Sequence, residues 1–215
     1  SGGAAGSFSY SYDNNAIPYK GALDEVQIYQ QALDEDAVAD LYRQTIQVLH
    51  LTLDDPPGET IFKNAIDTAH HGTCSAAACP TAGVTGRVNQ AARFNVTEND
   101  TLSIAKGPTN RLTNNLTVAA WIRPETVSGV QRIVSTARTK SNNGWGFGLN
   151  GSDLRFTTYG VKAYETTSIG LQAGRWTHVA AVMDKQNMVT FYVDGQLAIT
   201  ATHTAPAVAD TDDLL

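Results

Sequence analysis

Residues 174–196, GRWTHVAAVMDKQNMVTFYVDGQ, give the clearest indication of fold class. Two sets of side chains alternate along the first half of this stretch: Trp176, His178, Ala180 and Val182 in one, and Thr177, Val179, Ala181 and Met183 in the other. Alternation with a period of two is typical of a β-strand, and residues 184–187 supply a turn into a second strand at 188–193. Asp194–Gly195 supplies another two-residue turn. The stretch therefore predicts antiparallel strands joined by tight turns.

Short apolar runs separated by turn residues continue on both sides of this stretch, and Asn150–Gly151 is one such turn. The expected strands are 48–53, 101–105, 115–123, 130–136, 145–149, 153–159, 163–168, 175–183, 188–193 and 196–202, with a loop-rich section over 54–86. A single helix is expected at about 34–43, where Asp34 is a suitable N-cap. The pattern predicts an all-β protein, an antiparallel sandwich with one short helix.

The composition describes a folded protein without a basic surface. Hydrophobic residues make up 42% of the 215 residues and charged residues 17%, which allows a sizeable core. The chain carries 15 basic and 21 acidic residues, a formal net charge of −6, so nucleic acid is not an expected partner. No apolar run approaches the ~18 residues of a membrane-spanning helix, so membrane insertion is not expected. The first residues also lack the pattern of a signal peptide.

Several stretches resemble one known family. They are GALDEVQIYQQALDEDAVADLY (21–42), LHLTLDD (49–55), NAIDTAHHGTC (64–74), ARFN (92–95), NLTVAAWIRPE (115–125) and the 174–196 stretch. Together they resemble laminin-G-like domains of the concanavalin-A-like lectin–glucanase jelly-roll family, and the resemblance covers nearly the whole chain. It implies a jelly roll of two sheets with about a dozen antiparallel strands.

The order of the matching stretches differs from the family's order. The D-E-V-x-I-Y strand and its helix close a domain in the family, whereas here they come first. Residues 1–45 are therefore interpreted as the closing strands and helix of a jelly roll, and 48–215 as a jelly-roll body. The tail either completes its own body, as a circular permutation, or completes a neighbouring copy or repeat. A cut at an arbitrary point of a longer repeat protein is a third possibility. The expected donor-strand residues are Phe8, Tyr10, Tyr12, Leu23, Val26 and Ile28.

The resemblance and the residues together predict a non-catalytic extracellular module, secreted or on the cell surface. Glycosidases of this fold carry carboxylates at alternating strand positions, as in E-x-D-x-x-E, and no such run occurs. We expect a role in adhesion or assembly, as a head-to-tail strand-donating filament or tandem-repeat subunit whose partners are copies of itself or adjacent repeats. The alternative is a carbohydrate-binding lectin module of a secreted protein, with glycans as partners.

Cys74 and Cys79 are the only cysteines, and a disulfide between them suits an extracellular protein. Two alternatives stay open, a zinc site that adds His70 and His71, and a pair of free thiols.

Calcium is the cofactor that the resemblance implies, in a structural site between the loop after the first strand and the acidic closing strand. The matching positions are Asp24, Asn64 and Asp67, although the family favours Asp at position 64. The alternative is that these residues form turns.

Aromatic residues near turns are candidates for stacking on sugars, and Trp145 and Tyr159 are the main ones, with Tyr164 beside them. Trp145 alternates with apolar neighbours, so a place in the core is the alternative for it. Trp121 and Trp176 lie in strongly apolar strands and are expected in the core. Possible N-glycosylation sequons begin at Asn95, Asn99, Asn115 and Asn150.

Overall fold

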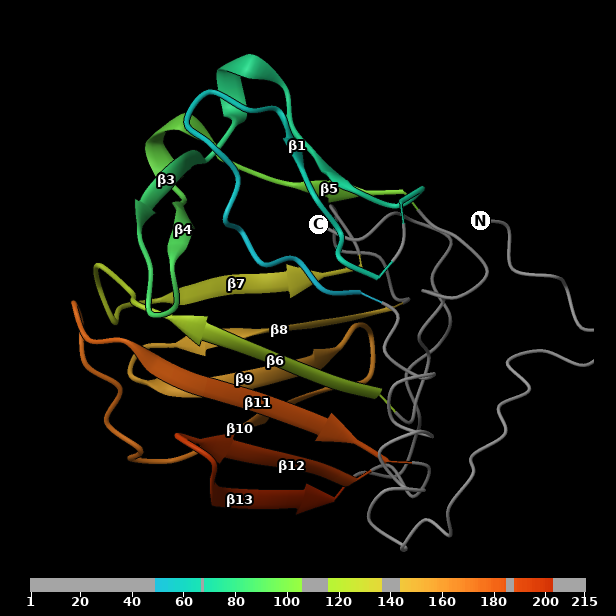
Figure 1. The fold of residues 1–215 in the computed structure, drawn as a ribbon. Coiled ribbons are helices and arrows are strands. Elements are labelled where there is room, and N and C mark those ends of the chain that lie inside the picture. The colour runs from blue at the N-terminus through green and yellow to red at the C-terminus, as the bar shows by residue number, and fades with distance from the viewer. Residues whose placement is uncertain (1–48, 67, 106–115, 137–143, 185–187, 203–215) are drawn as a thin grey trace, which may run out of the picture. The chain divides into compact units, whose positions relative to one another are not determined.

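The computed structural model describes residues 49–66, 68–105, 116–136, 144–184 and 188–202 (Figure 1). Over these residues it has thirteen strands and two short 3₁₀ helices. The strands are β1 (Ile61–Phe62), β2 (Gly72–Thr73), β3 (Thr81–Thr85), β4 (Gln90–Arg93), β5 (Ser103–Ile104), β6 (Leu116–Ile122), β7 (Val130–Ser135), β8 (Trp145–Asn150), β9 (Asp153–Thr158), β10 (Lys162–Glu165), β11 (Thr177–Met183), β12 (Met188–Val193) and β13 (Gln196–Thr202). The helices are η1 (Ala76–Ala78) and η2 (Val96–Glu98). The helix expected at 34–43 lies outside the described residues.

Two four-stranded antiparallel sheets form the body of the fold. One has the order β10-β9-β8-β7 and the other β13-β12-β11-β6, and the two lie one in front of the other (Figure 1). Their facing side chains form one core cluster, which includes Trp145, Phe147, Phe156, Val179 and Phe191. This arrangement confirms the predicted antiparallel sandwich.

The inward faces follow the alternation of the sequence. On β11, Val179, Ala181 and Met183 are fully buried, whereas His178 and Val182 are partly exposed and the small Ala180 is 8% exposed. On β8, large side chains at Trp145, Phe147 and Leu149 alternate with glycines, and the Trp145 ring stacks on Phe156 with centroids 5.8 Å apart. Each strand therefore contributes one apolar face to the core, as its period of two requires.

Two smaller sheets occupy the section that was expected to be loop-rich. One has the order β1-β2-β5, and the other is the β3–β4 hairpin. They enclose a second cluster of buried residues, Phe62, Ala82 and Leu102. The expected strand at 48–53 is represented, within its described part, by a single bridge between Leu51 and Asn64. β1 and β2, with two residues each, are too short to show an alternation, which is why the sequence pattern did not reveal them, whereas β5 lies within the expected strand 101–105.

Candidate ligand-binding pocket

An open pocket of about 390 Å³ lies where β6 ends and β11 begins, beside the β12–β13 turn. Its lining comes from four separate parts of the chain: the β3–β4 turn, the end of β6, the segment that enters β11, and the β12–β13 turn. The lining residues are Arg87, Trp121, Arg175, Trp176, His178, Asp194 and Gly195.

Trp121 is the most exposed aromatic ring of the pocket. On β6 the exposed positions are Thr117, Ala119 and Trp121, while Val118 and Ile122 pack against the core. Trp121 is therefore on the outer face of its sheet, with 43% of its surface exposed. Its register partner on β11 is His178, and the two rings meet edge to face with centroids 5.3 Å apart. The sequence prediction that Trp121 belongs to the core is wrong, because its neighbours at the same parity are outward residues.

The β12–β13 turn is held against β11 by Asp194. Asp194 and Gly195 both have positive φ, 48° and 78°, as a tight two-residue hairpin turn requires. The backbone N–H of His178 donates to Asp194 Oδ1 at 2.9 Å, and the N–H of Asp194 donates to the His178 carbonyl at 2.8 Å. The other carboxylate oxygen is 3.4 Å from Arg175 Nη2. Asp194 thus fixes the turn and leaves a carboxylate at the rim of the pocket.

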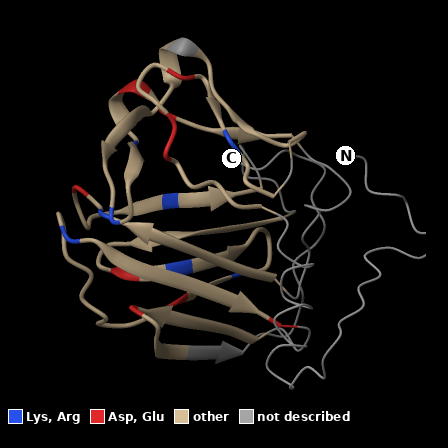
Figure 2. Cartoon of the chain, in the orientation of Figure 1, with Lys and Arg blue, Asp and Glu red and all other residues tan. Residues whose placement is uncertain are grey.

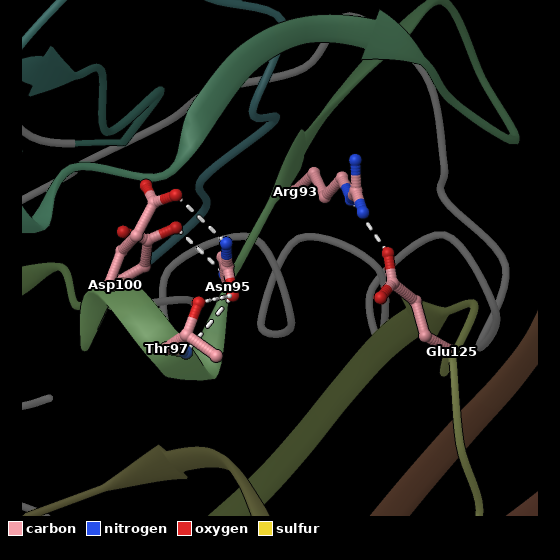
Figure 3. Close-up of polar contacts among 6 residues, drawn as sticks. Arg93, Asn95, Thr97, Asp100 and Glu125 are labelled. Atoms are coloured by element: carbon pink, nitrogen blue, oxygen red, sulfur yellow. Dashed lines mark hydrogen bonds and ion pairs between the residues drawn. The ribbon is translucent and has the colours of Figure 1, made fainter.

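The β3–β4 hairpin forms the opposite wall. Arg87, in its turn, places its guanidinium carbon 5.0 Å from the centroid of the Trp121 ring, and Figure 1 shows this turn beside the end of β6. Arg93 on β4 donates from Nε to Glu125 Oε1 at 2.7 Å, which connects the hairpin to the loop after β6 (Figure 3). Beyond β4, Asn95 caps η2 by accepting from the N–H of Thr97, and its own N–H donates to Asp100 (Figure 3). The hairpin is therefore held to the loop after β6 at the end of β4.

A second arginine–tryptophan pair lies next to the first. The guanidinium carbon of Arg123 is 5.7 Å from the centroid of the Trp176 ring, and Trp176 is partly exposed rather than in the core as expected. Elsewhere, the described basic residues are few and separated from one another (Figure 2). The pocket thus has two arginines and one carboxylate in its lining, with Arg123 over the ring of Trp176, in a chain whose formal net charge is −6.

The predicted disulfide is confirmed. The Cys74 and Cys79 sulfurs are bonded, with Cα atoms 5.1 Å apart, on either side of η1. Because both thiols are oxidised, they are not available as zinc ligands, and His71 instead accepts a hydrogen bond from the Asn64 N–H through Nδ1 at 3.0 Å.

Only one of the three expected calcium ligands lies within the described residues. Asn64 is buried, and its Oδ1 accepts from the backbone N–H groups of His50 and Ile66 at 3.0 and 3.1 Å. Both lone pairs of this oxygen are engaged, so it fits the turn-forming alternative and does not fit a cation ligand. Asp24 and Asp67 lie outside the described residues, and calcium binding stays a prediction. No group of three or more His, Cys, Asp or Glu residues suited to a metal occurs in the described part.

The two residues proposed for sugar stacking have different surroundings. Trp145 is 1% exposed, so its ring has no free face for a ligand, and the core alternative is the correct one. Tyr159 is partly exposed, and its hydroxyl is hydrogen-bonded to Ser135 at 2.8 Å. It lies on the sheet opposite to the pocket and takes no part in it. Tyr164 is also buried.

The expected donor-strand residues, Phe8, Tyr10, Tyr12, Leu23, Val26 and Ile28, all lie outside the described residues. The division into 1–45 and 48–215, and the choice between permutation and donation, stay predictions. Among the described residues, no helix has the length and apolar character needed to cross a membrane.

The pocket residues could be found only partly from sequence. Alternate residues of a strand lie on the same face, and the face that carries Trp121 also carries Thr117, Ala119 and Arg123. The polar residues among them indicate that this face is turned to solvent. Nothing near Arg87 in the sequence indicates that it meets Trp121.

Two facing antiparallel sheets of this kind define the jelly-roll class of β-sandwich domains. The family model described as the concanavalin A-like lectin/glucanases superfamily, of laminin-G type, matches residues 96–215. The match covers more than half of the chain, so the protein belongs to this family. A comparison with curated proteins gave no match.

Solved structures share the fold at low sequence identity. The binding domain of Paraclostridial mosquitocidal protein 1 is similar with a TM-score of 0.53 and 15% identity, over 76% of this chain and 47% of that one. The receptor-binding domain of botulinum neurotoxin type G gives 0.53 and 13%, over 78% and 45%. Domain 4 of an extracellular arabinanase from Geobacillus stearothermophilus, in complex with arabinotriose, gives 0.49 and 18%, over 70% and 74%. The chain thus spans less than half of the length of both toxin domains.

Proposed function

We propose that this protein is a non-catalytic saccharide-binding module and that the pocket around Trp121 is its binding site. One observation carries the proposal: an indole ring that is 43% exposed lies in a pocket whose other walls present both hydrogen-bond donors and an acceptor. Large aromatic rings on a protein surface are uncommon enough to mark interaction sites when polar groups converge beside them.

The chemistry of the lining suits a sugar. A pyranose ring has a face of C–H groups that packs on an aromatic ring, and hydroxyl groups around its edge that both donate and accept hydrogen bonds. Trp121 and Trp176 supply the aromatic surface, while Arg175 supplies donors and Asp194 an acceptor. Such a combination of an apolar platform and a few directional polar groups gives both affinity and orientation.

The absence of catalysis is part of the proposal. Glycoside hydrolysis uses two carboxyl groups that flank the scissile bond. The described lining of the pocket contains one, Asp194, which already accepts a backbone hydrogen bond and faces Arg175.

A location outside the cell is also proposed. The Cys74–Cys79 disulfide supports it, since such bonds persist in oxidising compartments. Two of the structures that share the fold are binding domains of toxins, so the fold is compatible with a binding role.

Binding to a panel of neutral and acidic oligosaccharides, followed by calorimetry, tests the proposal. Trp121→Ala should lower the affinity for the sugar roughly tenfold or more, because the contact with the indole ring is lost. Tyr159→Ala, on the other sheet, is the matched aromatic control and should bind as the parent does. A ligand that depends on Tyr159 and not on Trp121 would place the site on the other sheet and refute the assignment.

Assembly by strand donation is a second proposal, and the unpaired edges of the sheets favour it. Among the described residues β6 pairs only with β11, and β13 pairs only with β12, so this sheet has two open edges. An open edge is a template for an added strand, and the tail at 1–45 carries alternating apolar residues that suit one. Light scattering of the intact chain should show concentration-dependent oligomers that disappear when residues 1–45 are deleted. A monodisperse monomer of the intact chain over a wide concentration range would refute intermolecular donation.

A further inference from the structure

We propose that the saccharide recognised by this pocket carries an anionic group, a carboxylate or a sulfate, and that Arg87 binds it with help from Arg175. This inference rests on the proposed saccharide-binding function and adds the chemical class of the ligand.

The state of Arg87 is the first reason. Its guanidinium lies over the Trp121 ring, and among the described residues no carboxylate pairs with it. A guanidinium that lies over an indole can still offer N–H groups to an oxyanion. Arg123, stacked on Trp176, has no carboxylate partner in the described part either. By contrast, Arg93 and Arg155 each pair with a glutamate. In a chain that has more acidic than basic residues, an arginine without such a pair is more readily available to an anionic ligand.

The state of Arg175 is the second reason. Its contact with Asp194 is 3.4 Å long, and both side chains are largely solvent-exposed, at 60% and 40%. Exposed ion pairs of this kind contribute little stability, so Arg175 can turn to a bound anion at little cost. Charge-assisted hydrogen bonds from two guanidinium groups would then meet the acidic group at the rim of the pocket, while the sugar ring packs against the exposed surface that the two tryptophans leave in the lining.

The same observations favour an acidic sugar over nucleic acid. Nucleic acid presents a row of phosphates and needs a basic track to match it, whereas the lining of this pocket has two arginines, in a molecule with a net charge of −6. Asp194 at the rim is a suitable acceptor for a sugar hydroxyl.

The test uses the full chain and pairs of probes that differ only in charge. Trigalacturonate is compared with its methyl ester, and 6-sulfolactose with lactose, by calorimetry or by chemical-shift titration. At least one acidic probe should bind roughly tenfold or more tightly than its neutral partner, and added salt should reduce that difference. Arg87→Gln should remove most of the preference. Arg132→Gln, which takes an equally exposed arginine from above Tyr159 on the other sheet, is the matched control and should keep it.

Each result bears on two proposals, the saccharide site and the anionic class of its ligand. Preference for an acidic probe that Arg87→Gln abolishes and Arg132→Gln preserves supports both. Trp121-dependent binding of neutral and acidic probes with equal affinity overturns the anionic class and leaves the saccharide site intact. Binding of a single-stranded oligonucleotide but of no saccharide overturns both, as does the absence of any binding. The melting temperature of each variant is measured alongside, so that a loss of fold is not read as a loss of affinity.

Discussion

The three tryptophans of this chain have the same side chain and different roles, set by the face of the strand on which each lies. Trp145 is 1% exposed and stacks on Phe156, whereas Trp121 is 43% exposed beside His178. Trp176 has an intermediate position under Arg123. The difference matters because only an exposed ring has a face to offer a ligand.

Replacing the first two tryptophans by alanine should therefore have opposite consequences. Trp145→Ala should lower the free energy of unfolding by about 3–5 kcal/mol, because it opens a cavity in the core. Trp121→Ala should lower it by about 1 kcal/mol or less, since the ring is at the surface. Urea denaturation of both variants measures this. Equal losses would contradict the assignment of Trp121 to a binding surface.

Tyr164 makes the stability depend on pH in the alkaline range. Burial raises the pKa of its phenol above the ordinary value of 10.0, and a hydrogen bond with Thr158 opposes part of the rise. The folded state therefore keeps the proton to a higher pH than the unfolded state does. The stabilisation is complete below the unfolded pKa of about 10 and is lost as the pH rises through the folded value.

Thermal melts between about pH 9 and 11 should show this loss in the parent protein. Tyr164→Phe has no ionisable group at this position, so its melting temperature should fall less steeply over the same range. Parallel curves for the two proteins would show that Tyr164 does not ionise on unfolding.

The β7–β8 pair depends on a close backbone approach. The register of β7 shifts between Arg132 and Val134, which brings the carbonyl of Gln131 against Gly148 of β8. A Cβ built on Gly148 would overlap that carbonyl oxygen, although the φ of this glycine is not positive. The glycine is therefore required by space rather than by backbone conformation.

Gly148→Ala should lower the free energy of unfolding by about 1–3 kcal/mol, since two strands must move apart. Gly72→Ala on β2 is the matched control, because a Cβ there meets Phe62 and Leu102 side chains at ordinary distances of 3.5 and 3.6 Å. That variant should be neutral or more stable by up to about 1 kcal/mol. Equal destabilisation by Gly148→Ala and Gly72→Ala would mean that the close approach at the β7–β8 bulge is not the reason for the loss of stability.

The part of the fold around η1 is constrained by the disulfide, which closes a loop of short span. The loop-entropy relation gives about 2 kcal/mol for such a loop. The double variant Cys74→Ser/Cys79→Ser should therefore unfold at a lower urea concentration, with the two large sheets still formed. Alkylation followed by intact-mass analysis should label two thiols in the parent only after reduction. Labelling without reductant would contradict the bond.

The strands from β6 to β13 were predictable because the information is local. Each has four or more residues with a period of two, and turns such as Asp194–Gly195 mark where one ends and the next begins. The spacing of Cys74 and Cys79 was likewise enough to propose their bond. The family was predicted from the stretches that resemble laminin-G-like domains, and the family model confirms it over 96–215.

The pocket could not be read in the same way, because its composition depends on contacts between distant segments. Alternation says that Trp121 and Ile122 point to opposite faces, but the face that is buried is the one that the other sheet covers. Arg87 becomes a pocket residue only because the β3–β4 turn reaches the end of β6, where its guanidinium meets the Trp121 ring. Local sequence therefore set the strands and turns, whereas the packing of the β3–β4 hairpin beside the sandwich created the binding surface.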